Sequence, residues 1–449
     1  MRIAMIGGGY VGLVSAACFS EFGHEVHVVE NNPQRLYALQ NGEIPIYEPG
    51  LDTLVNTNMR AGRLSFGNNI AAAISDVQAV FIAVGTPPRN GDGHADLQYV
   101  YKAADEIAQS LTDYTVIITK STVPLGTSRK IAERIRQKNP KLDFDIASNP
   151  EFLREGNAIG DFMRPDRIIV GTDTAQPERS QNVQAILRTI YRPLSLIEVP
   201  ILFTNLESAE LTKYASNSFL AMKISFINEM ADLCDKVGAN VHDVARGMGL
   251  DKRIGQKFLH PGPGFGGSCF PKDTMALMHI AEEHQAPSRL VEATIKVNET
   301  RKTNMASRII AHCGGSVKNK TLAILGLTFK PETDDMRDAP SLSILQRLDD
   351  EGAHIQAFDP VGMETARPLL PHTVRYCSNV TEALTQADAV VILTEWNEFR
   401  ALPPEFLKTH MRGKIIIDLR NIFDPKTMIE VGLQYYSVGR ADLSLAPLP

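Results

Sequence analysis

Residues 2–12 read RIAMIGGGYVG. The stretch opens with a short apolar run typical of a buried strand and continues into Gly7-x-Gly9-x-x-Gly12, directly before an apolar helical pattern. In that context the first glycine forms a tight turn, the second lets a pyrophosphate approach, and the third lets helix and strand pack closely. We therefore expect a dinucleotide-binding unit here. The alternative, glycines that serve helix packing alone, stays open.

A carboxylate follows at the distance that such a unit requires. Glu30 ends the run HVVE, eighteen residues after Gly12. It can accept hydrogen bonds from an adenosine ribose and would repel a 2′-phosphate, so we expect NAD rather than NADP. Arg35 nearby leaves some use of NADP open.

The first two hundred residues alternate short β-branched runs with helical patterns. The runs are RIAMIG, EVHVVE, AVFIAVG, TVIITK, FDIASN and RIIVG. This alternation predicts a parallel, doubly wound sheet with helices on both faces. Residues that follow the strands, at their carboxyl ends, are expected to line the site.

Further along the chain the pattern changes twice. Long helical stretches run from about 204 to 238 and from 288 to about 313, and a second set of strands, TLAILG, HIQAFD, AVVILT and KIIIDLR, begins near Lys318. We predict an α/β protein with two Rossmann-like doubly wound parallel-sheet domains, 1–203 and 316–449, joined by a central helical region, 204–315. The first long helix is a candidate dimer interface, and burial against its own chain is an equal alternative.

Composition narrows the class of protein. With 449 residues, 43% hydrophobic and 22% charged, the chain is an ordinary globular protein, and its net charge of −6 argues against a nucleic-acid binder. The five cysteines form no CxxC pair, which predicts neither a disulfide framework nor a metal site and favours a reducing cytoplasm. No apolar run approaches the ~18 residues that span a bilayer, and glycines break the run at the N-terminus, so we expect neither a membrane protein nor a signal peptide.

The stretch GFGGSCFPKD, residues 264–273, places Cys269 between a glycine loop and a proline. A nucleophilic thiolate needs a helix N-terminus or a nearby cation. Pro271 suits the first turn of a helix through KDTMALMHIAEE, and Lys272 adds positive charge. Most cysteines are small buried hydrophobes, but the surrounding glycines favour close approach of a ligand. The motif indicates a nucleophile without naming its reaction.

The second set of strands lacks the glycine fingerprint. LAILGLTFKPETDDMRD has Lys330 and Arg337 where a dinucleotide site has glycines. We interpret it as a site for a different anionic ligand, with solvated surface charges as the alternative.

Six motifs occur in a fixed order: GGGYVG, KSTVP, NPEFLREG, KYASN, GFGGSCFPKD and GLTFKPETDDMRDAPS. Together they resemble the UDP-glucose/GDP-mannose dehydrogenase family of nucleotide-sugar dehydrogenases over nearly the whole chain. The form GSCFPKD is more similar to the members that oxidise UDP-glucose than to those for GDP-mannose or UDP-N-acetylmannosamine. The resemblance implies four-electron oxidation of the C6 alcohol of UDP-glucose to UDP-glucuronate with two NAD, through a thiohemiacetal and a thioester on Cys269.

Catalytic partners follow from spacing and from the resemblance. Lys213 and Asn217 share one face of the expected helix and can stabilise an oxyanion at C6, although a surface lysine and an exposed asparagine are the alternative. The resemblance implies that Glu151, with Thr122 and Asp273, positions or activates a water. Asp273, one turn past Cys269, can equally complement the helix dipole. The first proton acceptor stays open between Lys213 and a water held by Asp273.

The resemblance also implies the binding residues. NAD contacts are expected at Gly7, Gly9, Tyr10, Val11, Gly12, Glu30, Arg35, Thr86, Thr122, Glu155, Lys272 and Arg337. Nucleotide-sugar contacts are expected at Glu151, Phe152, Leu153, Arg154, Lys213, Asn217, Phe258, Leu259, His260, Pro261, Gly262, Gly266, Lys330 and Arg420, with Arg253 supplied across a homodimer. Two positions depart from the family: Glu30 where aspartate is frequent, and Arg35 where lysine is frequent.

Three other functions compete with this one. A related dehydrogenase would act on a UDP-N-acetylhexosamine or on GDP-mannose, because base and C2 recognition lie in loops. A catalytically silent NAD-binding regulatory protein would keep the fold without turnover. A two-electron hydroxyacid dehydrogenase would share the Lys-x-x-x-Asn helix and need no cysteine.

Overall fold

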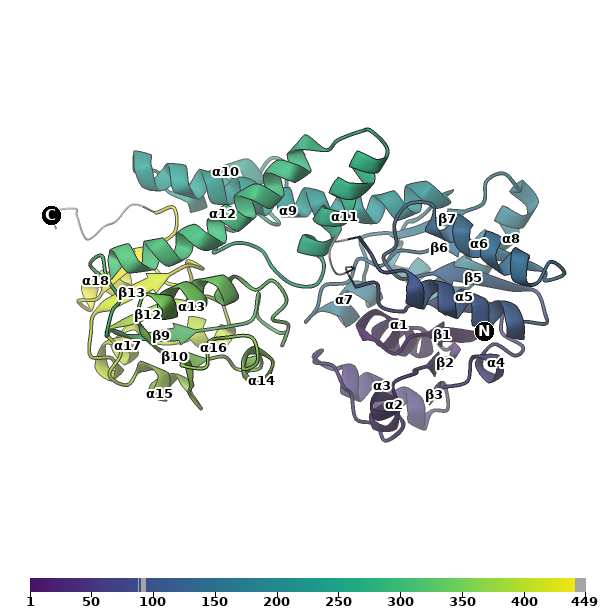
Figure 1. The fold of residues 1–449 in the computed structure, drawn as a ribbon, viewed down its shortest axis with the longest axis horizontal. Helices are drawn as coiled ribbons and strands as arrows, with labels where there is room; N and C mark the ends of the chain where they lie inside the picture. The colour runs from purple at the N-terminus through teal and green to yellow at the C-terminus, as the bar shows by residue number, and fades with distance from the viewer. Residues whose placement is uncertain (88, 90–93, 441–449) are drawn as a thin grey trace. The chain divides into compact units, whose positions relative to one another are not determined.

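The computed structural model describes residues 1–87, 89 and 94–440. The chain packs as two compact units, Met1–Ser216 and Asn217–Pro449, and helix α9 (Leu206–Val237) begins in the first and continues into the second (Figure 1). The division into three domains at 203 and 315 stays a prediction. Residues 441–449 of the expected third domain lie outside the described residues.

The described part of the first unit contains an eight-stranded sheet in the order β3-β2-β1-β4-β5-β6-β7-β8. Its strands are β1 (Arg2–Ile6), β2 (Glu25–Val29), β3 (Leu64–Gly67), β4 (Ala79–Ile82), β5 (Thr115–Thr119), β6 (Phe144–Ser148), β7 (Ile168–Thr172) and β8 (Ile201–Asn205). Strands β1 to β6 pair in parallel, which confirms the predicted doubly wound sheet. The expectation that all its strands are parallel is wrong at one edge, because β7 pairs antiparallel with β6. The run RIIVG is buried on both faces, a pattern typical of parallel strands, so nothing in the sequence indicated the reversed direction.

Helices cover both faces of this sheet. Alternate residues of β1 separate the two cores, since Ile3 and Met5 belong to one and Ala4 and Ile6 to the other. The first core includes residues of α1 (Tyr10–Glu21), α3 (Leu51–Arg60), α7 (Ala158–Met163) and α8 (Pro177–Ile190). The second includes α4 (Ile70–Ala73), α5 (Gln98–Ser110) and α6 (Thr127–Lys138). The short α2 (Pro33–Gln40) follows β2.

The second unit carries a six-stranded sheet in the order β11-β10-β9-β12-β13-β14, parallel throughout its described pairs. Its strands are β9 (Thr321–Leu325), β10 (His354–Phe358), β11 (Arg375–Tyr376), β12 (Ala389–Ile392), β13 (Ile415–Asp418) and β14 (Gln434–Ser437). Helices α13 (Pro340–Asp350), α14 (Met363–Ala366), α15 (Val380–Leu384), α16 (Asn397–Arg400), α17 (Pro404–His410) and α18 (Pro425–Glu430) accompany them. The expected second α/β sheet is thus confirmed, with β11 and β14 not anticipated.

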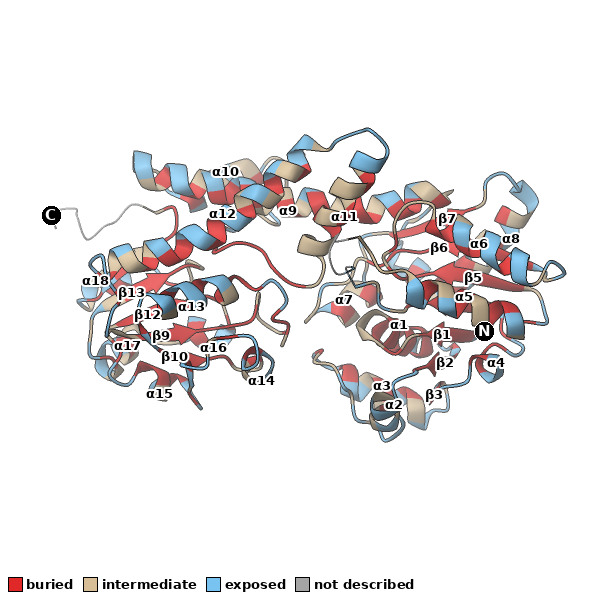
Figure 2. Ribbon diagram, viewed as in Figure 1, coloured by how far each residue is buried: buried red, intermediate tan, exposed pale blue. Residues whose placement is uncertain are grey.

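The remaining helices are α10 (Val241–Gly249), α11 (Phe270–Glu283) and α12 (Arg289–His312). Both long helices expected from the sequence are present as α9 and α12. Pro271 lies in the first turn of α11, as predicted, and Cys269 is the N-cap residue. The loop before α11 is unusual because residues 261–267 are buried although they belong to no helix or strand (Figure 2).

Candidate active site

The three glycines after β1 perform three different tasks. Gly7 has φ +113°, and a Cβ there would lie 2.6 Å from the Ala83 oxygen. A Cβ on Gly12 would lie 1.9 Å from the Gly7 oxygen. Gly9 has open space around it and is the N-cap of α1 without a side-chain cap. The tight turn, the close packing and the open approach at a helix N-terminus all suit a pyrophosphate. Tyr10 and Val11 follow in the first turn of α1.

Glu30 lies against this turn. The side chain is buried, and a Cβ on Gly8 would come within 2.9 Å of its carboxylate. Glu30 accepts a hydrogen bond from the Asn32 N–H at 2.8 Å, and Arg35 lies 3.6 Å away. The arginine that left NADP open is therefore paired with the carboxylate that would repel a 2′-phosphate.

Sequence analysis missed Glu48, which joins α1 to the segment after β6. Its carboxylate accepts hydrogen bonds from the Tyr10 hydroxyl, from Gly156 N at 2.6 Å and from Ala158 N at 2.7 Å. Burial, the contact with Glu48 and the charge of Glu155 all raise the pKa of Tyr10. Tyr10 and Glu155, both predicted near NAD, thus lie near each other at one side of the glycine turn.

Two further predicted NAD residues meet where β4 and β5 end. The Thr86 hydroxyl donates to the Thr122 carbonyl at 2.9 Å, and Ser121 donates to the Val84 carbonyl at 2.7 Å. Parallel strands end at the same edge of a sheet, and here hydroxyl groups tie these two ends together. Thr122 itself is half-buried.

A buried ion pair follows at the end of β6. Lys213 of α9 donates to the Glu151 carboxylate at 2.9 Å, and Leu153 N donates to its other oxygen at 2.6 Å. Burial raises the pKa of Glu151, but Lys213 and these hydrogen bonds outweigh it, so the carboxyl pKa lies below its usual range. The alternative of a solvent-exposed surface lysine at position 213 is wrong.

Lys120 of KSTVP is a second buried cation that sequence analysis did not single out. Its ammonium lies 3.1 Å from the Asn149 side-chain oxygen and 3.4 Å from the Tyr191 hydroxyl. Burial lowers the pKa of Lys120 to about 8, with Glu151 opposing and Lys213 reinforcing that shift. One carboxylate thus serves two buried ammonium groups.

The neighbouring substrate candidates have cationic surroundings. Arg167 lies 3.8 Å from the Phe152 ring centre, and the Lys213 ammonium lies 5.5 Å from it. Arg154 donates to Asp161 of α7 at 2.9 Å, so its charge is already paired.

In the second unit, Cys269 is half-buried, whereas the other four cysteines are buried. Its position as N-cap of α11 places it beside the first backbone N–H groups of that helix, as expected. The Ser268 hydroxyl lies 3.4 Å from the sulfur. Partial exposure and a position at a helix N-terminus are compatible with the nucleophile that the sequence predicts.

Asp273 lies one turn along α11 and is buried. Its carboxylate accepts from Asn217 at 2.6 Å and from Lys272 at 2.6 Å. Asn217 is also buried, so the alternative of a helix-exposed asparagine is wrong. Lys272, expected to add charge near the thiol, has its charge paired with Asp273.

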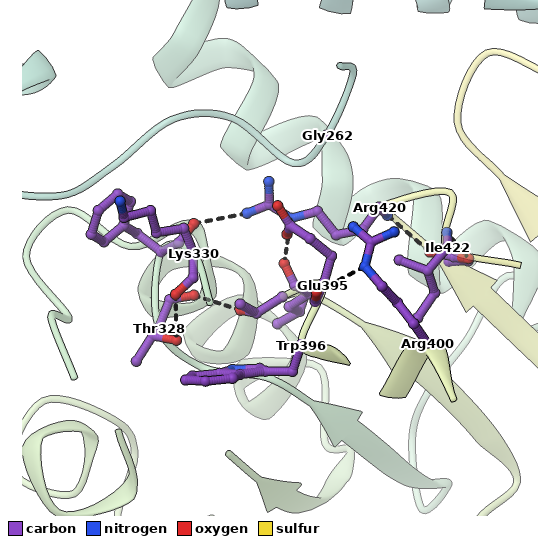
Figure 3. Close-up of polar contacts among 12 residues, drawn as sticks. Gly262, Thr328, Lys330, Glu395, Trp396, Arg400, Arg420 and Ile422 are labelled. Atoms are coloured by element: carbon purple, nitrogen blue, oxygen red, sulfur yellow. Dashed lines mark hydrogen bonds and ion pairs between the residues drawn. The ribbon is translucent and has the colours of Figure 1, made fainter. Parts of the chain in front are cut away.

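Three predicted nucleotide-sugar residues converge near the end of β13. Arg420 donates to the carbonyls of Leu393 and Phe329 at 2.7 and 2.9 Å, and it lies 3.0 Å from Glu395 (Figure 3). Lys330 follows Phe329 directly, and a Cβ on Gly262 would lie 3.1 Å from the Arg420 guanidinium. Sequence analysis missed Glu395, which forms an ion pair with the Arg420 guanidinium.

The remaining predicted residues have the following contacts and exposure in the structure. Gly266 packs against the Asp338 carbonyl, Arg337 pairs with Asp335 at 2.8 Å, and Phe258 has φ +66°. Leu259 and Pro261 are buried and His260 is exposed. The Arg253 side chain is 89% exposed and pairs with Asp251 of its own loop.

Two absences concern only the described part of the chain. It holds no group of three or more His, Cys, Asp or Glu side chains suited to a metal ion. Its helices include none with the length and apolar character needed to cross a membrane.

An open, largely parallel sheet with this glycine turn and acid is typical of a dinucleotide-binding protein. Models of three domains of the UDP-glucose/GDP-mannose dehydrogenase family match the chain in succession. They are the NAD binding domain over residues 1–195, the central domain over 207–300 and the UDP binding domain over 323–425. The chain belongs to the UDP-glucose/GDP-mannose dehydrogenase family.

Individual relatives support membership of the same family. UDP-glucose 6-dehydrogenase of Rhizobium meliloti (strain 1021) is 53% identical over 98% of this chain and 100% of its own. UDP-glucose 6-dehydrogenase TuaD of Bacillus subtilis (strain 168) is 46% identical over 98% and 93%. The structure of a UDP-glucose dehydrogenase from Pyrobaculum islandicum superposes with a TM-score of 0.88 at 36% identity, covering 98% of both chains.

Proposed function

We propose that this chain oxidises the C6 alcohol of UDP-glucose to the carboxylate of UDP-glucuronate and consumes two NAD. The observation that carries the proposal is the half-buried Cys269 at the N-cap of α11, with the Asn217–Asp273 pair one turn along. The relatives that are UDP-glucose 6-dehydrogenases support this substrate. Bound NAD supplies a hydride acceptor for each of the two oxidations.

The thiol divides the four-electron reaction into two similar steps. The first oxidation removes a hydride from C6 and a proton from its hydroxyl. Cys269 then adds to the aldehyde as a thiolate, and the former aldehyde oxygen takes up a proton to give a thiohemiacetal. This loses a second hydride and a proton to become a thioester. Water cleaves the C–S bond, which releases the carboxylate and returns the sulfur as a thiol.

The polar side chains act on oxygen and on protons in this scheme. Lys213 and Asn217 stabilise the negative charge that develops on the C6 oxygen, a contribution worth on the order of a hundredfold per donor. Glu151, Thr122 and Asp273 hold the water that attacks the thioester. The buried pairs Lys213–Glu151 and Asn217–Asp273 support these roles, because their geometry is set before substrate arrives.

Binding roles follow the residues already described. NAD is held by the glycine turn, Glu30 and the ends of β4 and β5 at Thr86 and Thr122, with Lys272 and Arg337 as further contacts. The nucleotide-sugar is bound by the backbone from Phe258 to Gly262 and by Gly266, by Phe152 to Arg154, and by Lys330 and Arg420. Gly262 beside Arg420 supports a single nucleotide site in the second unit.

The active protein is proposed to be a homodimer. Phe219, Phe226 and Leu233 recur every seven residues along α9 and are 58%, 42% and 53% exposed. A heptad of exposed apolar side chains is the pattern of a helix–helix seam. Arg253, exposed in one chain, would complete the partner's site. Mixing inactive Arg253→Ala and Cys269→Ala subunits would then restore part of the activity, because one site in each mixed dimer keeps both residues.

A cytoplasmic location is proposed with it. None of the five cysteines forms a disulfide, and four of them are buried, as expected for a protein of a reducing compartment.

The test is the number of NADH produced per UDP-glucose, with a panel that includes UDP-N-acetylhexosamines and GDP-mannose. Two NADH per UDP-glucose, lost in Cys269→Ala, is the expected result. One NADH would assign a two-electron reaction, and none on any sugar would favour a regulatory role. Preference for another sugar would move the protein within the family.

A further inference from the structure

The loop that leads to Cys269 poses a problem of hydrogen bonding. Residues 261–267, PGPGFGG, are buried but lie in neither helix nor strand. Buried backbone N–H and C=O groups need partners, and a loop of this kind has no ladder to provide them. Side chains from two long helices provide them here.

The first point of attachment is Gly262. Asn228 of α9 accepts a hydrogen bond from its N–H at 2.8 Å, and Arg301 of α12 donates to its carbonyl at 2.9 Å. Both polar groups of one residue are therefore held, each from a different helix.

The second point of attachment is Phe265. Asn298, one turn before Arg301 on α12, accepts from its N–H at 2.8 Å and donates to its carbonyl at 3.1 Å. The carboxamide thus pairs with the backbone as a neighbouring strand would. Gly264 between the two points has φ +119°, and a Cβ there would lie 3.0 Å from the Asn298 oxygen.

The opposite side of the loop is equally constrained. A Cβ on Gly266 would lie 2.4 Å from the Asp338 carbonyl, and one on Gly267 would lie 2.6 Å from the Phe329 ring. Gly267 N also donates to the Arg337 carbonyl at 2.7 Å. The loop is held on both sides up to two residues before Cys269.

A contribution to stability alone does not explain why a charged side chain is buried at position 301. The side chain is 3% exposed, it pairs with the half-exposed Asp232, and its Nη2 has no hydrogen-bond partner among the described residues. Buried charges of this kind are often replaced by apolar side chains without loss of stability. A buried donor without a partner adds a further cost.

We infer that Asn228, Asn298 and Arg301 form a clamp of positioning residues that sets the place of the Cys269 sulfur and the backbone from Phe258 to Gly262. They act through the loop rather than on substrate. The inference rests on the proposed function, because it assigns the loop to that reaction.

The chemistry of the two asparagines gives a sharp test. Asn298 uses both its oxygen and its nitrogen, so Asn298→Asp loses the bond to the Phe265 carbonyl and sets a carboxylate oxygen against it. Asn228 uses only its oxygen toward Gly262, so Asn228→Asp keeps that bond. Asn304→Asp makes the same change at an exposed position of α12.

Three readouts separate positioning from folding. Thermal unfolding checks that each variant is folded, and alkylation by iodoacetamide reports Cys269, since the other cysteines are buried. Turnover is measured with UDP-glucose and with its C6 aldehyde, which needs only the thiol-dependent half of the reaction. We expect Asn298→Asp to lower kcat on the aldehyde about ten- to a hundredfold with little change in KM and to alter the alkylation rate. Asn228→Asp keeps its bond to Gly262 and should lose less than Asn298→Asp, and the exposed control Asn304→Asp should stay near the wild type.

A folded Asn298→Asp variant with wild-type alkylation and turnover would overturn the clamp, as would a loss in Asn304→Asp equal to that in Asn298→Asp. Hydrogen exchange on the unmodified chain provides a measurement that needs no variant. The peptide covering 261–267 should exchange as slowly as α12, and rapid exchange would contradict the inference. Failure of the proposed function is distinguishable, because the wild type itself would then produce no NADH from UDP-glucose.

Discussion

The Lys213 ammonium lies 2.9 Å from the Glu151 carboxylate, and both side chains are nearly excluded from water. Removing one member of such a pair leaves an uncompensated buried charge, which costs about 3–5 kcal/mol. We therefore expect Glu151→Gln to lower the free energy of unfolding by about that amount in urea titrations at pH 7.

The control is Glu207→Gln, which breaks the more exposed pair with Arg129 and should cost below about 1 kcal/mol. The pKa of Glu151 is lowered in the folded chain, so its contribution is complete above the usual carboxyl range and is lost as the pH falls through that lowered pKa. The difference between wild type and Glu151→Gln should shrink in acid. A constant difference would contradict the paired carboxylate.

The buried Lys120 is expected to make the free energy of unfolding depend on pH in the alkaline range. Burial lowers its pKa to about 8, while an unfolded lysine has a pKa of about 10.4. Between these values the unfolded chain binds more protons, so Lys120 makes the free energy of unfolding rise with pH. The stability of the wild type relative to Lys120→Met should increase from pH 8 to pH 10. The exposed Lys141→Met should show no such window, and a flat difference at Lys120 would refute the shift.

Glu30 is expected to determine the preference for NAD over NADP. Glu30→Ala removes the repulsion of a 2′-phosphate and frees Arg35, which lies 3.6 Å from the carboxylate. The ratio of kcat/KM for NADP to that for NAD should rise at least about tenfold, which corresponds to about 1.4 kcal/mol. Glu25→Ala, an exposed change at the start of β2, the strand that Glu30 follows, should leave the ratio unchanged. An unchanged ratio in Glu30→Ala would assign discrimination elsewhere.

Alanine variants at two glycines distinguish the cost of backbone strain from the cost of close packing. Gly255 and Gly267 have φ +72° and +86°, but only Gly267 has neighbours within 4 Å, the Phe329 ring. Both alanine variants carry the conformational cost, and Gly267→Ala should lose about 1–3 kcal/mol more through overpacking. Denaturant unfolding of the pair measures the difference. Equal losses would mean that the Phe329 ring moves aside.

Local patterns predicted the elements that bind dinucleotide and carry the thiol. Gly7, Gly9 and Gly12 lie on one turn, and Pro271 opens the helix that Cys269 precedes. Each of these depends on neighbours within a few residues, where steric rules and helix geometry apply directly. The same rules indicated both long helices and most of the strands.

Several residues that act over long sequence distances were not found. Glu48 bonds to Gly156, and Lys120 reaches Tyr191. Asn228, Asn298 and Arg301 converge on the cysteine loop from two helices. A polar residue on a helix has the same appearance in the sequence whether it faces water or a buried loop. The direction of β7 was also not predicted, because burial on both faces is typical of parallel strands whereas β7 pairs antiparallel with β6.

The sequence by itself determined the glycine turn, the acid at the end of β2, the helix that begins after Cys269, and the family motifs that connect them. Short-range sterics and the periods of helix and strand are sufficient for these. Only the tertiary structure decided which polar side chains are buried, which carboxylate serves Lys213 and Lys120, and what holds the loop from Gly262 to Gly267. Those choices depend on desolvation and on contacts between residues far apart in the chain, which no local pattern records.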